Sequence, residues 1–419
     1  MALRVSVTFL LLLPYFLLPA TSSAGIVNKQ KQVVENSLET DPGEVIVGTA
    51  AELAEAVVQA NLGGPKTILI RDGTYTLDDG LWVEAAGVTV RSLSGNRSAV
   101  IIQGQGMAGD VSHIFNVPGA NFTVRDVTLK GVCNHAIQIH GNYNATAPTI
   151  RNVHILDTYE QMIKVSYDPA DLGKRADNGV VEDCLLEYSA GIGPQWYIGG
   201  VDAHNARNWI VRRNIFRGIR SPSEDVAEFA IHFWSGSEDT LVERNIIINC
   251  DRAIGLGLGD RGHQRGIVRN NMIYHNAVEG FADVGIAVES APGAQVYNNT
   301  IYQEHSYPHA IEYRFPATTG VLIANNLTNK AISPRDGATG TVSDNVTNAQ
   351  ASWFVNPPAG DLHLKSVIKT VVDQGRIIAG LATDFDGDPR PRGAGIDIGA
   401  DEFKSSGALV PSTLLLLSD

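Results

Sequence analysis

Acidic, basic and aromatic side chains recur at matching positions of two neighbouring segments of the chain. The segment GGVDAH supplies Asp202 and His204, and the segment FAIHFW supplies His232. A carboxylate beside an imidazole orients the ring and raises its basicity. Asp202 and His232 are therefore predicted to form a general-base unit, and His204 is the alternative base.

Two cations near these residues favour chemistry on an acidic substrate. Lys164 lies one repeat before Asp202, and Arg261 lies in the segment that follows His232. A cation that neutralises a substrate carboxylate acidifies the neighbouring C–H bond, which permits β-elimination. Hydrolysis instead needs two carboxylates about 5–5.5 Å or about 6.5–9.5 Å apart. Asp202 and Glu289 lie three repeats apart, roughly 14 Å at about 4.8 Å per coil, so elimination is favoured.

Other residues of the same segments are predicted to bind substrate. Trp234 is expected to point outward as a platform for a sugar ring, above a groove floor of small residues. The groove walls are expected from the insertions 167–180, 187–198, 217–228 and 258–266. The residues predicted to bind substrate are Trp234, Gly255, Gly257, Asp260, His263, Glu289, Glu312 and Arg314. The alternative is that these charged groups form ordinary surface ion pairs.

A degenerate repeat positions these candidates. It consists of an aliphatic residue, two polar residues, an asparagine and an apolar residue, and it runs from VRDVTL (124–129) to VSDNVT (342–347). The asparagines are Asn214, Asn245, Asn271, Asn299, Asn326 and Asn345. Identical side chains stacked in a parallel solenoid can hydrogen-bond along the stack. The repeat therefore predicts an all-β chain, a right-handed parallel β-helix (solenoid), over residues 45–403.

A second element follows each asparagine position and alternates apolar and polar residues, which is typical of strands with one buried face. The residues predicted to stack inside are Ile137, Ile163, Val201, Ile231, Ile254, Ile286 and Ile311. The residues between them, Lys164, Asp202 and His232 included, should then emerge on one outer wall. A short helix over 49–60, with Thr49 as N-cap and Glu52 completing a capping box, is expected to cap the N-terminal end of the stack.

The termini, the net charge and the cysteines predict the cellular location and the partners of the protein. An apolar run from Val5 to Leu18 follows Arg4 and precedes a cleavage pattern ending at Ala24, so residues 1–24 are predicted to be a signal peptide of a secreted or periplasmic protein. No membrane span is expected after its removal. The net charge of −13 argues against a nucleic-acid partner. The three cysteines are predicted to be free, buried thiols, and a monomer is expected. Residues 404–419 form a tail without an interpretation.

Two segments resemble a known family. GTAAELAEAVVQANLGGPKTILIRDGTYTL (48–77) resembles the first coil of secreted β-helix polysaccharide lyases of the chondroitinase-B and alginate-lyase type. GDLHLKSVIKTVVDQG (360–375) and DFDGDPRPRGAGIDIGADEF (384–403) are similar to the C-terminal signature of secreted β-helix proteins. The resemblance implies the solenoid and a pectate-lyase-like architecture. The catalytic Asn–Glu–Glu–Lys arrangement of those lyases has no match here, so no catalytic residue is carried over from them.

The residues and the resemblance together predict a secreted carbohydrate-active enzyme that cleaves an acidic polysaccharide by β-elimination. The alternatives are a glycoside hydrolase or epimerase on the same groove, or a carbohydrate-binding or adhesion solenoid without catalysis. Calcium is a candidate cofactor because Asp384, Asp386 and Asp388 alternate as oxygen ligands can. A turn in which these aspartates pair with Arg390 or Arg392 is the preferred interpretation of that run.

Overall fold

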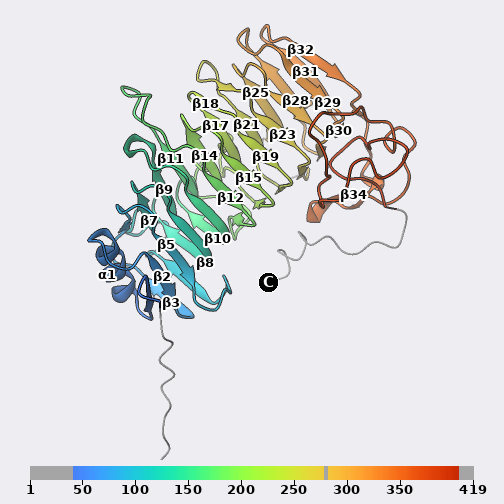
Figure 1. The fold of residues 1–419 in the computed structure, drawn as a ribbon. Helices are drawn as coiled ribbons and strands as arrows, with labels where there is room; N and C mark the ends of the chain where they lie inside the picture. The colour runs from blue at the N-terminus through green and yellow to red at the C-terminus, as the bar shows by residue number, and fades with distance from the viewer. Residues whose placement is uncertain (1–40, 278–281, 405–419) are drawn as a thin grey trace, which may run out of the picture. The chain divides into compact units, whose positions relative to one another are not determined.

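The computed structural model describes residues 41–277 and 282–404. Within them the chain winds into a stack of coils made of short parallel strands (Figure 1). This confirms the parallel β-helix predicted from the repeat. The predicted signal peptide 1–24 and residues 405–419 of the tail lie outside the described residues. Among the described residues, no helix combines the length and the apolar character needed to cross a bilayer.

Each coil contributes strands to three rows. The first row consists of β1 (Glu44–Val47), β2 (Thr67–Ile70), β5 (Thr89–Ser92), β8 (Thr123–Val132), β10 (Thr149–Thr158), β12 (Val180–Glu182), β15 (Ile210–Arg212), β19 (Leu241–Glu243), β23 (Ile267–Arg269), β26 (Gln295–Tyr297), β29 (Val321–Ala324) and β32 (Gly340–Ser343). The second row consists of β3 (Gly73–Thr76), β6 (Val100–Gln103), β13 (Leu185–Glu187), β16 (Ile215–Arg217), β20 (Ile246–Ile248), β24 (Met272–His275), β27 (Thr300–Gln303) and β30 (Leu327–Thr328). The long strands β8 and β10 belong to both rows and join them into one 20-stranded sheet.

The third row is a separate 10-stranded parallel sheet. Its strands are β4 (Leu81–Trp82), β7 (Phe115–Val117), β9 (Ile137–His140), β11 (Ile163–Ser166), β14 (Val201–His204), β17 (Ile231–Trp234), β21 (Ile254–Leu256), β25 (Ile286–Glu289), β28 (His309–Arg314) and β31 (Ala331–Arg335). The predicted inward stack lies in register along this sheet, with Val201 beside Ile231 and Ile231 beside Ile254. These side chains are fully buried, so the predicted phase of alternation is confirmed.

The asparagine ladder forms at the corner between the first two rows. Each side-chain amide donates to the next asparagine oxygen, as from Asn245 to Asn271 (2.9 Å) and from Asn271 to Asn299 (2.9 Å). The same oxygens accept backbone N–H groups, and Asn271 Oδ1 accepts that of Asn245 at 3.0 Å. The residue before each asparagine turns the chain through a positive φ, as at Arg244 (57°) and Asn270 (52°). The ladder therefore satisfies buried polar groups at a tight corner, where unpaired groups would be costly.

Replacing Asn271 by alanine is expected to lower the free energy of unfolding by about 2–3 kcal/mol, because it leaves several buried donors and acceptors without partners. Asn271 is 0 % exposed and bonds to both neighbouring rungs. Asn345→Ala removes the same groups at the half-exposed last rung and is expected to cost less than half as much. Denaturant unfolding followed by circular dichroism measures both. Equal losses would contradict the assigned role of burial.

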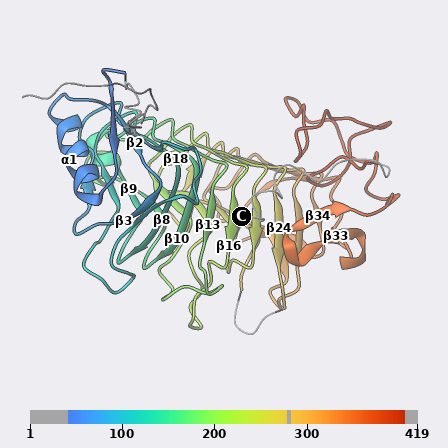
Figure 2. The same cartoon turned by 90° about the horizontal axis from the view of Figure 1, so that it is seen from below.

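The two ends of the described chain differ. Helix α1 (Ala50–Asn61) begins after Thr49, whose hydroxyl accepts the Glu52 N–H at 3.1 Å, and Glu52 accepts the Gly48 N–H at 2.7 Å. The predicted capped helix is thus confirmed, and it packs on β1, β2 and β4. Near the other end, the antiparallel pair β33 (Phe354–Asn356) and β34 (Asp361–Leu364) packs against the second row (Figure 2). Residues 371–400 contribute Val371, Phe385 and Ile398 to the same cluster.

All three cysteines are free, as predicted. Cys184 and Cys250 are buried, and burial raises the pKa of each thiol to about 12. Cys133 is only half-buried, so the prediction of full burial is wrong for this residue. Cys184 occupies the position before the first ladder asparagine, and its backbone N–H donates to Asn214 Oδ1 at 2.9 Å.

Candidate functional site

The outer face of the 10-stranded sheet brings the main predicted residues together. Lys164, Asp202 and His232 are direct neighbours on β11, β14 and β17, and His204 is the neighbour of Trp234. All of them share one outer wall, as the alternation predicts. The wall is nevertheless not open to solvent, because loops fold over it.

Asp202 is the centre of this cluster. It is 1 % exposed, forms an ion pair with Lys164 through one oxygen, and accepts the indole N–H of Trp234 through the other at 2.7 Å. Burial raises the pKa of this carboxyl group, but the charge of Lys164 and its hydrogen bond outweigh burial, so the pKa lies below its usual value. Asp202 is therefore an ionised group held between a cation and an indole.

His232 does not form the predicted general-base unit. Its Nδ1 lies 3.7 Å from Asp202 Oδ1, without a hydrogen bond, and its Nε2 donates to the Gly257 carbonyl oxygen at 3.3 Å. The side chain is 0 % exposed, and burial lowers its pKa to about 3. A ring with no solvent-facing edge cannot take a proton from a polymer in a groove. The expectation that substrate reaches His232 is therefore wrong.

His204 lies nearer the surface and is held on every side. Tyr167 stacks on its ring with centroids 5.0 Å apart, and Trp234 lies 4.6 Å away on the next coil. Its Nδ1 is 3.1 Å from the Ser235 hydroxyl, and its Nε2 is 3.8 Å from Asp202 Oδ2. Burial lowers the pKa of His204 to about 4, so the ring is neutral near pH 7.

Trp234 is not the open sugar platform that the alternation suggested. It is 7 % exposed, because His204 and His232 lie beside its ring and the Arg261 guanidinium lies 3.7 Å from its centroid. Arg261 itself is exposed, and among the described residues no carboxylate forms an ion pair with it. The cation available to a ligand at this position is therefore Arg261.

The predicted groove floor of small residues is also closed. A Cβ on Gly255 would lie 2.7 Å from the ring of Phe229, which packs with Val284 and Ala287 over this part of the sheet. Gly257 has a φ of +82°, and a Cβ there would lie 1.9 Å from the Glu289 carbonyl oxygen. The glycines thus make room for Phe229 and for a tight turn, so the prediction that they line an open groove is wrong.

The two acidic residues at the far end of the wall pair with protein groups. Glu289 accepts the Gly259 N–H at 2.7 Å and lies 3.4 Å from the guanidinium of Arg314. Glu312 accepts the Tyr307 hydroxyl at 2.5 Å and pairs with Arg335 at 3.0 Å. These contacts satisfy the carboxylates within the protein, which matches the ion-pair alternative.

Two residues that the sequence reasoning missed complete the cluster. The hydroxyl of Tyr197 lies 3.3 Å from Lys164 Nζ, and Glu228 Oε2 lies 3.7 Å from His232 Nδ1. Burial raises the pKa of Glu228. Both residues belong to insertions predicted as groove walls, 187–198 and 217–228. Loop length was thus the available signal, but aperiodic loops do not reveal which side chains turn inward.

Two pockets open on either side of Tyr167, which lines both of them. One, of about 690 Å³, is bordered by Asp260, Arg261 and His263. His263 is 1 % exposed, and its ring bonds to Thr240 at 2.9 Å. The second, of about 520 Å³, is lined mostly by aromatic and amide side chains, together with one carboxylate, that of Asp79. That lining includes Trp82, His113, Asn116, Gln138, His140 and Asn142.

The aspartate run near the C-terminus fits the turn rather than a calcium loop. Asp384 accepts the N–H groups of Gly387 and Asp388, and Asp388 pairs with Arg392 at 3.1 Å. Arg390 pairs with Glu402 instead, at 2.7 Å. Asp386 belongs to a different group in the described residues, together with His363 and Asp401.

Several solved structures are similar to this chain. The alginate lyase from Paenibacillus sp. is 15 % identical, with 72 % of this chain and 99 % of that chain covered and a TM-score of 0.35. Pectate lyase Pel9A is 14 % identical, with 81 % and 88 % covered and a TM-score of 0.42. The surface adhesin PfbA of Streptococcus pneumoniae is 12 % identical, with 71 % and 87 % covered and a TM-score of 0.47.

At such values these likenesses carry no argument about function. No curated protein matches the chain. The family model described as the right handed beta helix region matches residues 112–358, which is more than half of the sequence. The chain therefore belongs to the right-handed β-helix family.

Proposed function

We propose that this protein is a secreted carbohydrate-active enzyme that binds an acidic polysaccharide in the two pockets beside the covered outer face of the 10-stranded sheet and cleaves it by β-elimination. One observation carries the proposal, namely a connected series of side-chain contacts that ends at Arg261, which lines the first pocket. Tyr197 contacts Lys164, Lys164 pairs with Asp202, Asp202 accepts from Trp234, and Arg261 covers Trp234. The supporting contacts are all between side chains.

The residue at each end of this series of contacts can take part in the proposed reaction. Arg261 is exposed and can pair with a substrate carboxylate, because guanidinium and carboxylate match in shape and charge. That pairing makes the proton on the adjacent carbon more acidic. At the other end, the Tyr197 oxygen lies 3.3 Å from the Lys164 ammonium and is the proposed acceptor of that proton. Asp202 keeps Lys164 charged and fixed in place.

The proposed elimination moves one proton to the base and one to the leaving oxygen. Tyr197 takes the proton on the carbon next to the carboxylate, a carbon–carbon double bond forms, and the glycosidic C–O bond breaks. The departing oxygen takes a proton from Glu228, whose pKa is raised by burial so that it holds a proton more readily than an exposed glutamate. The aromatic and amide side chains of the second pocket, which also contains Asp79, suit the remaining sugar units, which stack on rings such as Trp82.

Hydrolysis is a second candidate because of one specific distance. Asp202 Oδ1 and Glu228 Oε2 both lie 3.7 Å from His232 Nδ1, so the two oxygens are separated by at most twice that distance. Paired carboxylates of glycoside hydrolases lie about 5–5.5 Å or about 6.5–9.5 Å apart. The pKa of Asp202 is lowered and the pKa of Glu228 is raised, as is typical of a paired base and acid. Against hydrolysis, both oxygens of Asp202 already bind protein groups.

Incubation with a panel of uronate and neutral polysaccharides distinguishes the candidates. Elimination produces an unsaturated product with new ultraviolet absorbance, which is the expected result with at least one uronate polymer. New reducing ends without absorbance would indicate hydrolysis and would overturn the lyase assignment. Binding without either product would indicate a carbohydrate-binding or adhesion solenoid.

Removing the cation at the pocket should weaken binding. Arg261→Gln is expected to raise the Kd for an acidic oligosaccharide about tenfold and to reduce its salt dependence, because one charge-assisted contact is lost. Arg265→Gln is the matched control, since Arg265 is 51 % exposed and pairs with Glu238 and Asp239 instead. Isothermal titration calorimetry at two salt concentrations measures both variants. The same loss of affinity in both would show only a dependence on net charge.

A further inference from the structure

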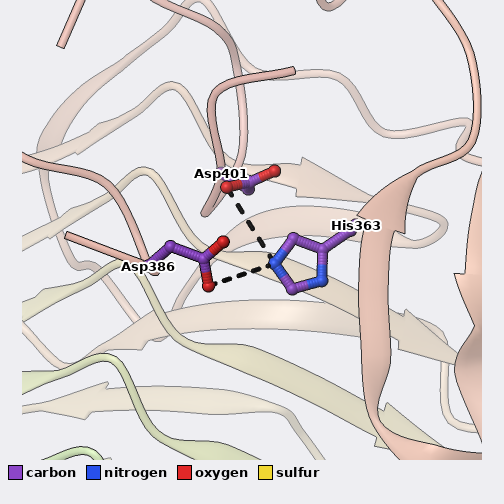
Figure 3. Close-up of side chains that lie close together, drawn as sticks. All are labelled: His363, Asp386 and Asp401. Carbon is purple, nitrogen blue, oxygen red and sulfur yellow. Dashed lines mark ion pairs between the residues drawn. The ribbon is translucent and has the colours of Figure 1, made fainter. Parts of the chain in front are cut away.

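Three side chains from separate segments converge near the C-terminal end of the described chain. His363 lies on β34, Asp386 follows Asp384 in a turn, and Asp401 lies in the last described segment (Figure 3). Their facing atoms all lie within 4.8 Å of one another. His363 Nε2 is 3.5 Å from Asp386 Oδ1 and 3.9 Å from Asp401 Oδ1.

These facing atoms are buried and lack hydrogen-bond partners. His363 Nε2, Asp386 Oδ1 and Asp401 Oδ1 are all shielded from water without a hydrogen bond to protein. The side chains are only 12 %, 12 % and 11 % exposed. Buried polar atoms normally form hydrogen bonds, so three such atoms that face one point and share only the longer contacts of 3.5 Å and 3.9 Å indicate a ligand between them.

Neighbouring side chains fix the orientation of His363 and Asp386. His363 Nδ1 lies 2.6 Å from Asp361 Oδ1, so Nε2 is the ring nitrogen that faces the two other carboxylates. Metal-binding histidines almost always have such a carboxylate or carbonyl partner on their other nitrogen. Asp386 uses its second oxygen for Lys404 at 2.7 Å and keeps Oδ1 for the cluster. Asp384 joins the two loops, because it accepts N–H groups of Asp388 and Glu402.

The donor atoms select the kind of ion. One imidazole nitrogen and two carboxylate oxygens suit zinc and similar transition metals, whereas calcium takes oxygen ligands only. Bonds of about 2.0–2.2 Å in a tetrahedral site place neighbouring ligand atoms roughly 3.4 Å apart. The observed 3.5 Å and 3.9 Å are close to that value.

We propose that His363, Asp386 and Asp401 bind one divalent transition-metal ion, of which zinc is the representative. The ion connects β34 to the loops around Asp386 and Asp401. Those segments pack through Leu362, Phe385 and Ile398 against the second row of strands. The site is therefore structural, since it fastens the C-terminal segments to the coils. It is independent of the polysaccharide chemistry proposed above.

The test uses the full chain after removal of metal by a chelator. Titration with Zn²⁺ in a calorimeter is expected to show one site per chain, and saturation is expected to raise Tm by about 3–6 °C. His363→Gln and Asp401→Asn should each lower zinc affinity at least tenfold and remove the Tm increase. Asp388→Asn is the matched control in the same loop, where Asp388 pairs with Arg392 and Lys404, and it should bind zinc like the parent chain.

Three outcomes would overturn the proposal. The first is an absence of zinc binding, with His363→Gln lowering Tm to the same extent with and without zinc, because the cluster would then be a protonated histidine between two carboxylates. The second is equal zinc affinity in His363→Gln and the parent chain, which would place the ion elsewhere. The third is tighter binding of Ca²⁺ than of Zn²⁺, which would contradict the assigned donor set.

Discussion

Replacing Tyr197 by phenylalanine is expected to reduce kcat for elimination about 100- to 10,000-fold, which is the range for loss of a general base. The variant keeps the aromatic ring and removes only the hydroxyl that contacts Lys164 at 3.3 Å. Binding of the polymer should change little, because Arg261 and the two pockets are untouched. Initial rates of product absorbance and a separate binding titration provide the two measurements.

Tyr302→Phe is the control for this experiment. Tyr302 is also half-buried, but it lies on β27 with its ring 5.7 Å from that of Phe354. Its loss of a hydroxyl should leave both rate and affinity unchanged. If Tyr197→Phe retained full activity while Glu228→Gln abolished the release of reducing ends, the phenol would not be the base and the hydrolase candidate would gain support.

Replacing Asp202 by alanine is expected to destabilise the fold by about 3–5 kcal/mol, since it leaves the Lys164 ammonium buried without its counter-ion. The side chains of Lys164 and Asp202 are only 11 % and 2 % exposed. The indole N–H of Trp234 also loses its acceptor. Asp239→Ala is the matched control, because Asp239 is 39 % exposed in its pair with Arg265. Exposed pairs contribute about 0–1 kcal/mol.

A double variant separates charge from packing. If the cost arises from the orphaned ammonium, adding Lys164→Met to Asp202→Ala should recover at least half of the lost stability. Guanidinium unfolding curves of the two single variants and the double variant measure this. A double variant no more stable than Asp202→Ala alone would mean that the carboxylate matters through Trp234 rather than through Lys164.

The fold was predictable because its repeat constrains every coil in the same way. An asparagine that bonds to the next asparagine must recur at the corner, as at Asn245 and Asn271, and a strand with one buried face must alternate. The same alternation correctly placed Asp202 and His232 side by side. Neither inference required knowledge of the loops.

Only the site residues that lie on strands could be predicted, because the register positions strands and not loops. Tyr197 and Glu228 lie in segments without periodicity. Phe229 begins the segment FAIHFW but precedes the strand itself, which starts at Ile231, so the alternation did not indicate that Phe229 would cover Gly255. The alternation predicts a solvent-exposed outer wall, whereas His232 is 0 % exposed. Strand alternation specifies which side of a sheet a residue faces, but burial on that side depends on whatever the connecting segments place there.

The coils also differ in how much chain they use. Asn214 and Asn245 are bonded rungs 31 residues apart, whereas Asn326 and Asn345 are bonded rungs only 19 residues apart. The strands therefore stack in register whatever the length of the loops that connect them within a coil. An exposed segment such as 169–174 could be exchanged for one of another length and composition while the neighbouring coils stay in register. Specificity for a polymer can thus evolve in this scaffold by transplanting loops, at little cost to its folding.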